Sequence, residues 1–141
     1  MHIKLADELL TGNKIIDEQH KELFKRIDLA FQATKQGKGA QKTNEALTFL
    51  EFYMFEHFHN EEKLQFDYAF PEFEAHKKQH DTFKKEYYKL KEKINKETDD
   101  YSLVIQLLDL IVDWFSRHIK RMDKNVSAHI IKTNKIEQQA Q

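Results

Sequence analysis

The sequence predicts an all-α fold, an up-down-up-down antiparallel four-helix bundle followed by a short C-terminal helix. Three observations lead to this prediction. The 141 residues include only 3 glycines and 1 proline, so few positions interrupt a helix. Four segments carry apolar residues at the three- and four-residue spacing of a helix face. The stretches between these segments are short, and short loops favour antiparallel neighbours.

The four segments are recognised by their apolar stripes. The first runs roughly over 17–36 and the second over 43–65. The third begins near Pro71, because proline is favoured in the first turn of a helix. The polar stretch 95–100 is expected to be a loop, and the fourth segment follows it. A long two-helix coiled coil is the weaker alternative, because the pattern is interrupted between every pair of segments.

The length of the chain suits one hydrophobic core, so we expect a single domain over 1–141. Its parts would be an N-terminal arm at 1–15 and the bundle at about 16–123. A short helix and a polar tail would follow at 124–141. We find no internal repeat and no composition shift that marks a second domain.

Composition excludes several classes of protein. The formal net charge is −1, from 23 Lys and Arg against 24 Asp and Glu, which gives no electrostatic reason to bind nucleic acid or an anionic membrane. No apolar run approaches the ~20 residues of a membrane span, and the first residues lack the apolar run of a signal peptide. Cysteine is absent, which excludes disulfides and thiolate metal ligands. We expect a cytoplasmic monomer that binds neither nucleic acid nor membrane.

Polar side chains interrupt the apolar stripes at positions that should face the core. Six of them can bind a metal ion: His20, His57, Glu61, His76, His80 and His118. Burying such a group without partners costs several kcal/mol, whereas a whole domain is stable by only about 5–15 kcal/mol. A lone buried histidine is usually an ordinary core residue, and an isolated His-x-x-x-His pair is only moderately specific. Six such residues together therefore predict a bound metal, which would compensate the free-energy cost of burying them.

The six residues also converge at one end of the predicted bundle. They lie near the start of the first and third segments and near the end of the second and fourth. In an antiparallel bundle these positions share one end, and at about 1.5 Å rise per residue each is within two or three turns of it. His59 is two residues from His57 and points to another face, so we exclude it. This convergence predicts a metal centre.

Asp123 would add a second carboxylate at the same end. It follows His118 by five residues. Positions i and i+5 point about 140° apart on a regular α-helix, so both side chains cannot face the core from one. We therefore predict a π-bulge or a broken turn within 118–123, a defect that often occurs at functional sites.

The ligand count indicates two metal ions. Five histidines and two carboxylates are too many for one ion, and without thiolates they suit iron or manganese better than structural zinc. If both ions are octahedral iron, two bridging carboxylates and a bridging oxide or hydroxide fill three positions on each. Five histidines then occupy five of the six remaining positions. One ion keeps an open position, which suits a small diatomic ligand.

These motifs together resemble those of the bacterial members of the hemerythrin family, and the resemblance covers nearly the whole chain. Each motif alone is weak, but their combined order is highly specific. They are Ile-Asp-Glu-Gln-His-Lys-Glu-Leu at 16–23, His57-x-x-x-Glu61 followed by Glu62, His76-x-x-x-His80, and His118 with Asp123 five residues later.

The resemblance implies a role for each residue and a function for the protein. The saturated iron would be bound by His76, His80 and His118, the iron with the open position by His20 and His57, and both by the bridging Glu61 and Asp123. Proteins of this family bind dioxygen reversibly at two ferrous ions. We expect two iron ions, a bridging oxide or hydroxide, and a dioxygen carrier, store or sensor that is not an enzyme. A di-iron peroxidase or oxidase, an iron store, a nitric oxide scavenger and a structural metal site are the alternatives.

An apolar pocket is expected beside the open position, formed by Leu23, Phe24, Trp114 and Phe115. Such a pocket discourages proton delivery, which favours release of intact dioxygen over cleavage of the O–O bond. The chain departs from the family pattern at Phe115, where a leucine is expected, and it lacks an N-terminal tryptophan. We hypothesise that the Phe115 ring narrows access to the open position. Plain core packing is the alternative.

Overall fold

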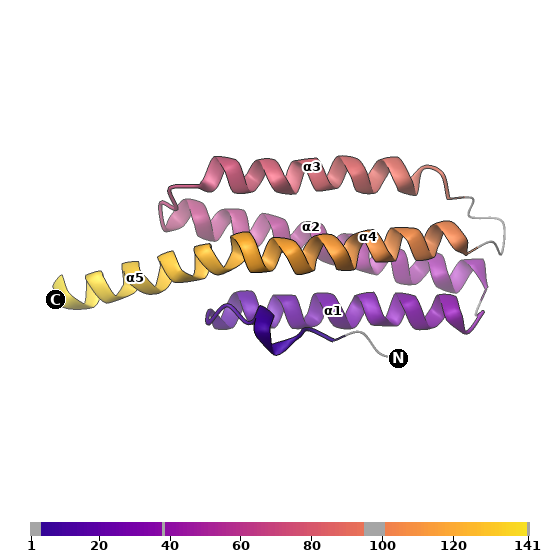
Figure 1. Ribbon diagram of the computed structural model, residues 1–141, viewed down its shortest axis with the longest axis horizontal. Helices are drawn as coiled ribbons and strands as arrows, with labels where there is room; N and C mark the ends of the chain where they lie inside the picture. The colour runs from indigo at the N-terminus through magenta and orange to yellow at the C-terminus, as the bar shows by residue number, and fades with distance from the viewer. Residues whose placement is uncertain (1–3, 38, 95–100, 141) are drawn as a thin grey trace.

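The fold is a helical bundle, and the computed structural model describes it over residues 4–37, 39–94 and 101–140. Within these ranges the chain forms four long helices, α1 (Lys14–Lys35), α2 (Ala40–Asp67), α3 (Phe73–Lys91) and α4 (Ser102–His118), and a C-terminal helix, α5 (Lys124–Ala140). Figure 1 shows α1 to α4 side by side, with α1 and α3 running in the opposite direction to α2 and α4. Helices α1 and α3 each contact both α2 and α4. The predicted all-α up-down-up-down bundle is therefore confirmed.

Local interactions explain where the first helices begin. Helix α1 starts a little earlier than predicted, because the Asn13 side chain accepts a hydrogen bond from the Ile16 backbone N–H at 3.0 Å and caps the helix. Helix α2 starts directly after Gly39, whose φ of 94° lies in the region that favours glycine. The loop predicted at 95–100 lies outside the described residues.

The fourth helix passes through a π-helical turn before it becomes α5. The turn spans Ile119–Asp123 and confirms the irregularity predicted within 118–123. Helix α5 follows directly and extends beyond the end of the bundle (Figure 1). The C-terminal helix is thus confirmed, but it continues to Ala140, where a polar tail was predicted. Residues 132–140 contain neither glycine nor proline, and extending an existing helix costs far less than starting one.

The N-terminal arm is held at the base of the bundle by Asp17. Its carboxylate accepts hydrogen bonds from the Thr11 N–H at 2.8 Å, the Thr11 hydroxyl at 2.7 Å and the Gly12 N–H at 3.1 Å. The Ser127 hydroxyl of α5 donates to the Thr11 carbonyl at 2.9 Å. These bonds join the start of α1 to the start of α5, about one turn below His20.

Two apolar clusters make up the core. The larger one draws residues from α1 to α4, among them Leu23, Met54, Phe83, Ile111 and Phe115. The smaller one consists of Ile16, Phe70, Val126 and Ile130. Between these clusters lie the polar residues predicted to bind metal; His20, for example, falls between Ile16 and Leu23 on α1.

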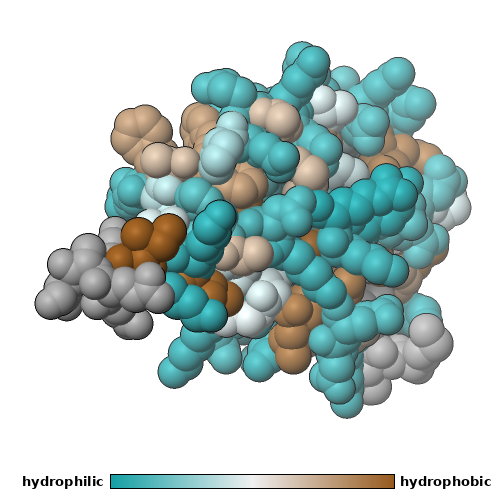
Figure 2. Space-filling view, turned by 60° about the vertical axis from the view of Figure 1, so that its left-hand side comes forward, coloured by the Kyte–Doolittle hydropathy of each residue, from teal (hydrophilic) through white to brown (hydrophobic). Residues whose placement is uncertain are grey.

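The surface is mostly hydrophilic on the face in Figure 2, where apolar side chains form separate small patches. None of the described helices carries an apolar stretch long enough to span a lipid bilayer. The polar residues gathered inside the bundle are therefore the main departure from an ordinary helical core.

Candidate metal centre

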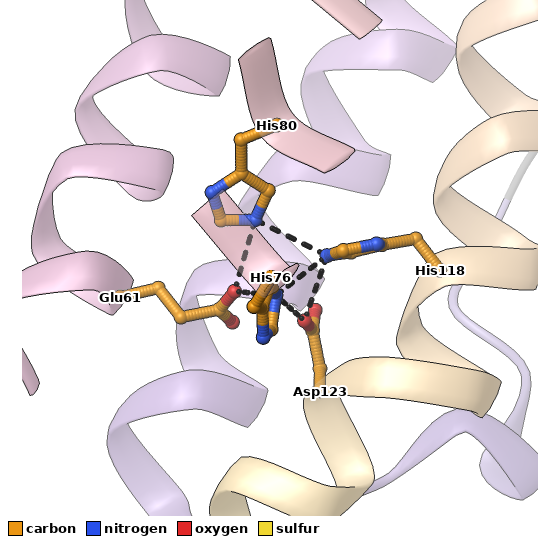
Figure 3. A group of neighbouring side chains, drawn as sticks. All are labelled: Glu61, His76, His80, His118 and Asp123. Carbon is orange, nitrogen blue, oxygen red and sulfur yellow. Dashed lines mark hydrogen bonds and ion pairs between the residues drawn. The ribbon is translucent and has the colours of Figure 1, made fainter. Parts of the chain in front are cut away.

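The seven predicted ligand residues meet in one buried layer of the bundle. Every one of their side chains is at most 4% exposed. Their ligand atoms form two groups, each within 4.8 Å: Glu61, His76, His80, His118 and Asp123 in the first, and His20, His57, Glu61 and Asp123 in the second. Figure 3 shows the first group, in which three rings and two carboxylates point toward a common centre. Both carboxylates belong to both groups.

Glu61 directs one carboxylate oxygen toward each group. Its Oε1 atom lies 2.9 Å from Nε2 of His76 and 3.2 Å from Nε2 of His80. Its Oε2 atom faces Nε2 of His57 at 3.7 Å. A carboxylate divided in this way can bind one metal ion through each oxygen.

The two carboxylate oxygens of Asp123 likewise face different groups of histidines. Its Oδ1 atom lies 3.0 Å from Nε2 of both His76 and His118, and its Oδ2 atom lies 2.9 Å from Nε2 of His20. The π-helical turn makes this possible, because on a regular α-helix Asp123 would point about 140° away from His118. Asp123 is fully buried as a result.

The spacing of the ring nitrogens fits a metal ion. Nε2 of His118 lies 2.8 Å from Nε2 of His76 and 3.1 Å from Nε2 of His80. Two ligands bound at right angles to an ion, each about 2.1 Å from it, are about 3.0 Å apart, whereas tetrahedral ligands are about 3.4 Å apart. The observed spacing is therefore short enough for the three rings to bind one ion.

The close contacts within the layer leave buried atoms without hydrogen bonds. Among the described atoms, both oxygens of Glu61 and of Asp123 lack a partner with hydrogen-bond geometry, as do both nitrogens of His20. Unpartnered charged groups in a protein interior cost several kcal/mol each. A metal ion at the centre of each group would compensate this cost, because it supplies positive charge and direct bonds.

Lowered pKa values hold three of these histidines in the neutral form. Burial lowers the pKa of His57 to about 3, and burial also lowers the pKa of His80 and of His118. Burial acts in the same direction on His76, but its contacts with the two carboxylates raise its pKa to about 9. A neutral imidazole keeps the lone pair that a metal ion requires, so most of the site is prepared for binding.

The two carboxylates have opposite pKa shifts. Burial would raise the pKa of Asp123, but the neighbouring histidines, His118 foremost, hold it well below its usual range. Burial and the negative charge of Asp123 raise the pKa of Glu61 well above its usual range. One carboxylate therefore stays charged in the metal-free protein, and the other releases a proton when a cation enters.

Three further side chains hold the outer nitrogens of the rings, and the sequence analysis assigned no role to them. They place a side-chain oxygen near Nδ1: Gln19 at 2.7 Å from His57, Glu62 at 3.1 Å from His80, and Gln79 at 3.2 Å from His118. Each stands beside a predicted ligand in the sequence yet contacts a ring on the next helix. Neighbouring residues on a helix point about 100° apart, so a residue next to a ligand can reach a ring on the adjacent helix. A polar residue directly beside a predicted ligand was therefore the signal in the sequence for these three contacts.

Aromatic rings pack against histidines of both groups. Phe115 is fully buried, and its ring centroid lies 6.5 Å from that of His57. Phe58, which the sequence analysis overlooked, stacks on His80 with centroids 4.1 Å apart. Trp114 stacks on His118 with centroids 4.3 Å apart, so it lies beside the three-histidine group. The Trp114 ring also contacts Phe115, with centroids 4.9 Å apart.

The remaining residues of the expected pocket belong to the larger apolar cluster. Leu23 is fully buried and Phe24 is 2% exposed. His59 is exposed, as its spacing from His57 predicted. Sequence spacing thus separated inward from outward histidines correctly on α2.

The sequence matches known proteins over the whole region of the site. The family model of the hemerythrin HHE cation binding domain matches residues 11–130. A bacteriohemerythrin of Aquifex aeolicus is 26% identical over 119 residues, which cover 84% of this chain and 90% of that protein. Bacteriohemerythrins of Pseudomonas paraeruginosa and Pseudomonas aeruginosa are 32% and 31% identical over 124 residues, covering 86% of this chain and 77% of each relative.

Proposed function

Because the chain belongs to the hemerythrin family, we propose that it binds two iron ions and, when both are ferrous, binds dioxygen reversibly. His76, His80 and His118 would hold one ion, His20 and His57 would hold the other, and both carboxylates would bridge them. The observation that carries this proposal is the division of each carboxylate between the two groups of histidines.

The unequal number of histidines supports a ligand site at only one ion. With octahedral iron, two carboxylate oxygens, three ring nitrogens and one bridging oxide or hydroxide would complete six positions at the first ion. The second ion would have one ring nitrogen fewer, because its group holds only His20 and His57, so one position would stay open there. A single open position on ferrous iron suits a diatomic molecule.

The surroundings of His57 favour binding over oxidation chemistry. The Phe115 ring lies close to His57, and Phe58 stacks with Phe115 at a centroid distance of 5.5 Å. Enzymes that cleave the O–O bond need a nearby acid or base to move protons, and apolar rings do not supply one. We therefore propose a non-enzymatic carrier, store or sensor of dioxygen.

Anaerobic reconstitution tests this function. Iron-free protein mixed with ferrous iron should bind two ions per chain, and oxygen should then produce a visible charge-transfer band that disappears when oxygen is removed. Irreversible conversion to the ferric form with turnover of peroxide would support an oxidase or peroxidase instead. Uptake of many ferric ions per chain would indicate iron storage. Failure to bind two ions per chain would contradict the di-iron site.

We predict that Phe115→Leu makes dioxygen dissociate and the site autoxidise severalfold faster. The ring is fully buried near His57, and a smaller side chain should open space beside the free position. Stopped-flow dissociation and the rate of ferric accumulation in air measure the two effects. Tyr87→Leu is the matched control, because Tyr87 is almost equally buried but its ring packs against Phe55, Phe83 and Tyr88 rather than against a histidine. Equal rates in Phe115→Leu and wild type would show that Phe115 serves only packing.

A further inference from the structure

We propose that Glu62 is a positioning residue of the metal centre, which fixes the orientation and tautomer of His80 and strengthens its bond to the metal. The inference rests on the proposed di-iron site. Glu62 lies on α2 directly after Glu61, turned away from the centre by about 100° toward α3. Its Oε2 atom is 3.1 Å from Nδ1 of His80, and its side chain is only 16% exposed.

The His80 ring is restrained on three sides. Nδ1 faces Glu62, Nε2 faces Oε1 of Glu61 at 3.2 Å, and the Phe58 ring stacks on one face with an interplanar angle of 17°. Two successive residues of α2 therefore contact the two nitrogens of one ring on α3. This arrangement leaves His80 little freedom to rotate, so Nε2 is already aimed at the metal position.

The chemistry of the three outer contacts distinguishes Glu62 from the others. An ionised carboxylate can only accept a hydrogen bond, so Nδ1 of His80 must carry the proton and Nε2 must carry the lone pair. Gln19 and Gln79 are amides, which can present either an oxygen acceptor or an N–H donor to a ring. Among these three contacts, only that of Glu62 selects the metal-binding tautomer by its chemistry alone.

The negative charge of Glu62 has a second consequence. A carboxylate on the outer nitrogen makes an imidazole a more basic ligand, which strengthens its bond to the metal and stabilises the ferric state over the ferrous state. His118 of the same group has an amide in the corresponding place. Glu62 should therefore lower the reduction potential of the three-histidine ion, although it never touches that ion.

Variants at position 62 and a reciprocal variant test this role. Glu62→Leu should lower ferrous iron affinity about 10- to 100-fold, the usual cost of losing an outer partner. Glu62→Gln keeps an acceptor of similar size, so affinity should fall less, while the reduction potential should become more positive. Gln79→Glu places a carboxylate beside His118 and should shift the potential in the negative direction. Iron titration and redox titration of the reconstituted full chain supply both readouts.

Asp81→Asn is the matched control. Asp81 follows His80 on α3 and pairs with Lys77 at 2.9 Å on the surface, so its removal changes the local charge without touching a ring. Glu62 variants that match wild type in affinity and potential would overturn the proposal, as would equal potential shifts in Glu62→Gln and Asp81→Asn. If circular dichroism shows that Glu62→Leu does not fold, the reduction potentials of Glu62→Gln and Gln79→Glu still test the proposal. Wild-type protein without two bound irons would instead overturn the proposed function.

Discussion

Glu61→Gln is expected to reduce bound iron from two ions per chain to one or none. Glu61 is fully buried and directs one oxygen to each group of histidines. Glutamine has one carbonyl oxygen, and its NH2 group would point at a cation. The variant therefore loses an anionic ligand at both ions and cannot bridge them. Metal analysis after anaerobic reconstitution and gel filtration measures the stoichiometry.

Two comparisons make this test specific. Asp123→Asn should lose iron in the same way, because Asp123 is divided between the same two groups. Asp113→Asn should retain both ions, because Asp113 is an exposed residue of α4 that pairs with Arg117 at 2.8 Å. A Glu61→Gln protein that binds two ions as tightly as wild type would show that the carboxylate is not a bridge.

Removal of iron is expected to lower the melting temperature by about 10 °C or more. The stability of the iron-free protein is also expected to fall as the pH falls. A ligand present at 1,000 times its dissociation constant stabilises the folded state by about 4 kcal/mol, and each kcal/mol shifts the melting temperature of a chain of this length by about 3 °C. The metal-free layer also contains buried carboxylates and imidazoles whose partners are incomplete. Thermal unfolding followed by circular dichroism, with and without iron, measures the difference.

The direction of the pH effect follows from the pKa shifts in the metal-free protein. The pKa of His57 is lowered to about 3, and those of His80 and His118 are lowered as well. Below pH 6.5 these histidines take up protons in the unfolded chain but not in the folded one, so their contribution to stability falls as the pH falls. Glu61 acts in the opposite direction, because its raised pKa lets the folded chain bind a proton before the unfolded chain does, but it is one group against three. From pH 6.5 to 5, His57 alone contributes a loss of about 2 kcal/mol. His76, with a pKa of about 9, acts oppositely at higher pH.

A pair of histidine variants on α2 checks this reasoning in the metal-free protein. His57→Leu should reduce the slope of the unfolding free energy against pH between pH 7 and 5. The reduction should correspond to about one proton fewer taken up on unfolding. His59→Leu should leave the slope unchanged, because His59 is exposed. Equal slopes in wild type and His57→Leu would mean that His57 does not stay neutral in the fold.

Most of the bundle could be predicted because helical periodicity is a local property. The scarcity of glycine and proline and the four apolar stripes were enough for the fold class. The extent of α5 was underestimated, because polar residues beyond 131 carry no apolar periodicity although they are good helix formers. The π-helical turn could be predicted only because two inward-facing ligands were separated by five residues.

The packing around the site was harder to predict. Trp114 and Phe115 were both expected in the apolar pocket, yet Phe115 is fully buried whereas Trp114 is only partly buried against His118. Neighbouring residues on a helix differ by about 100°, so either can lie within a broad apolar face. The rotation of the helix against its partners decides between them, and no local pattern records that rotation.

By itself, the sequence determined the kinds of ligand and their depth along the bundle, because residue type and axial rise are local quantities. It also required the irregular turn that brings Asp123 inward. The division of the histidines into groups of three and two came from the family resemblance and not from helical spacing. The fold alone shows how Gln19, Glu62 and Gln79 reach rings on neighbouring helices. These contacts depend on the distance and rotation between helices, which four chain segments set together.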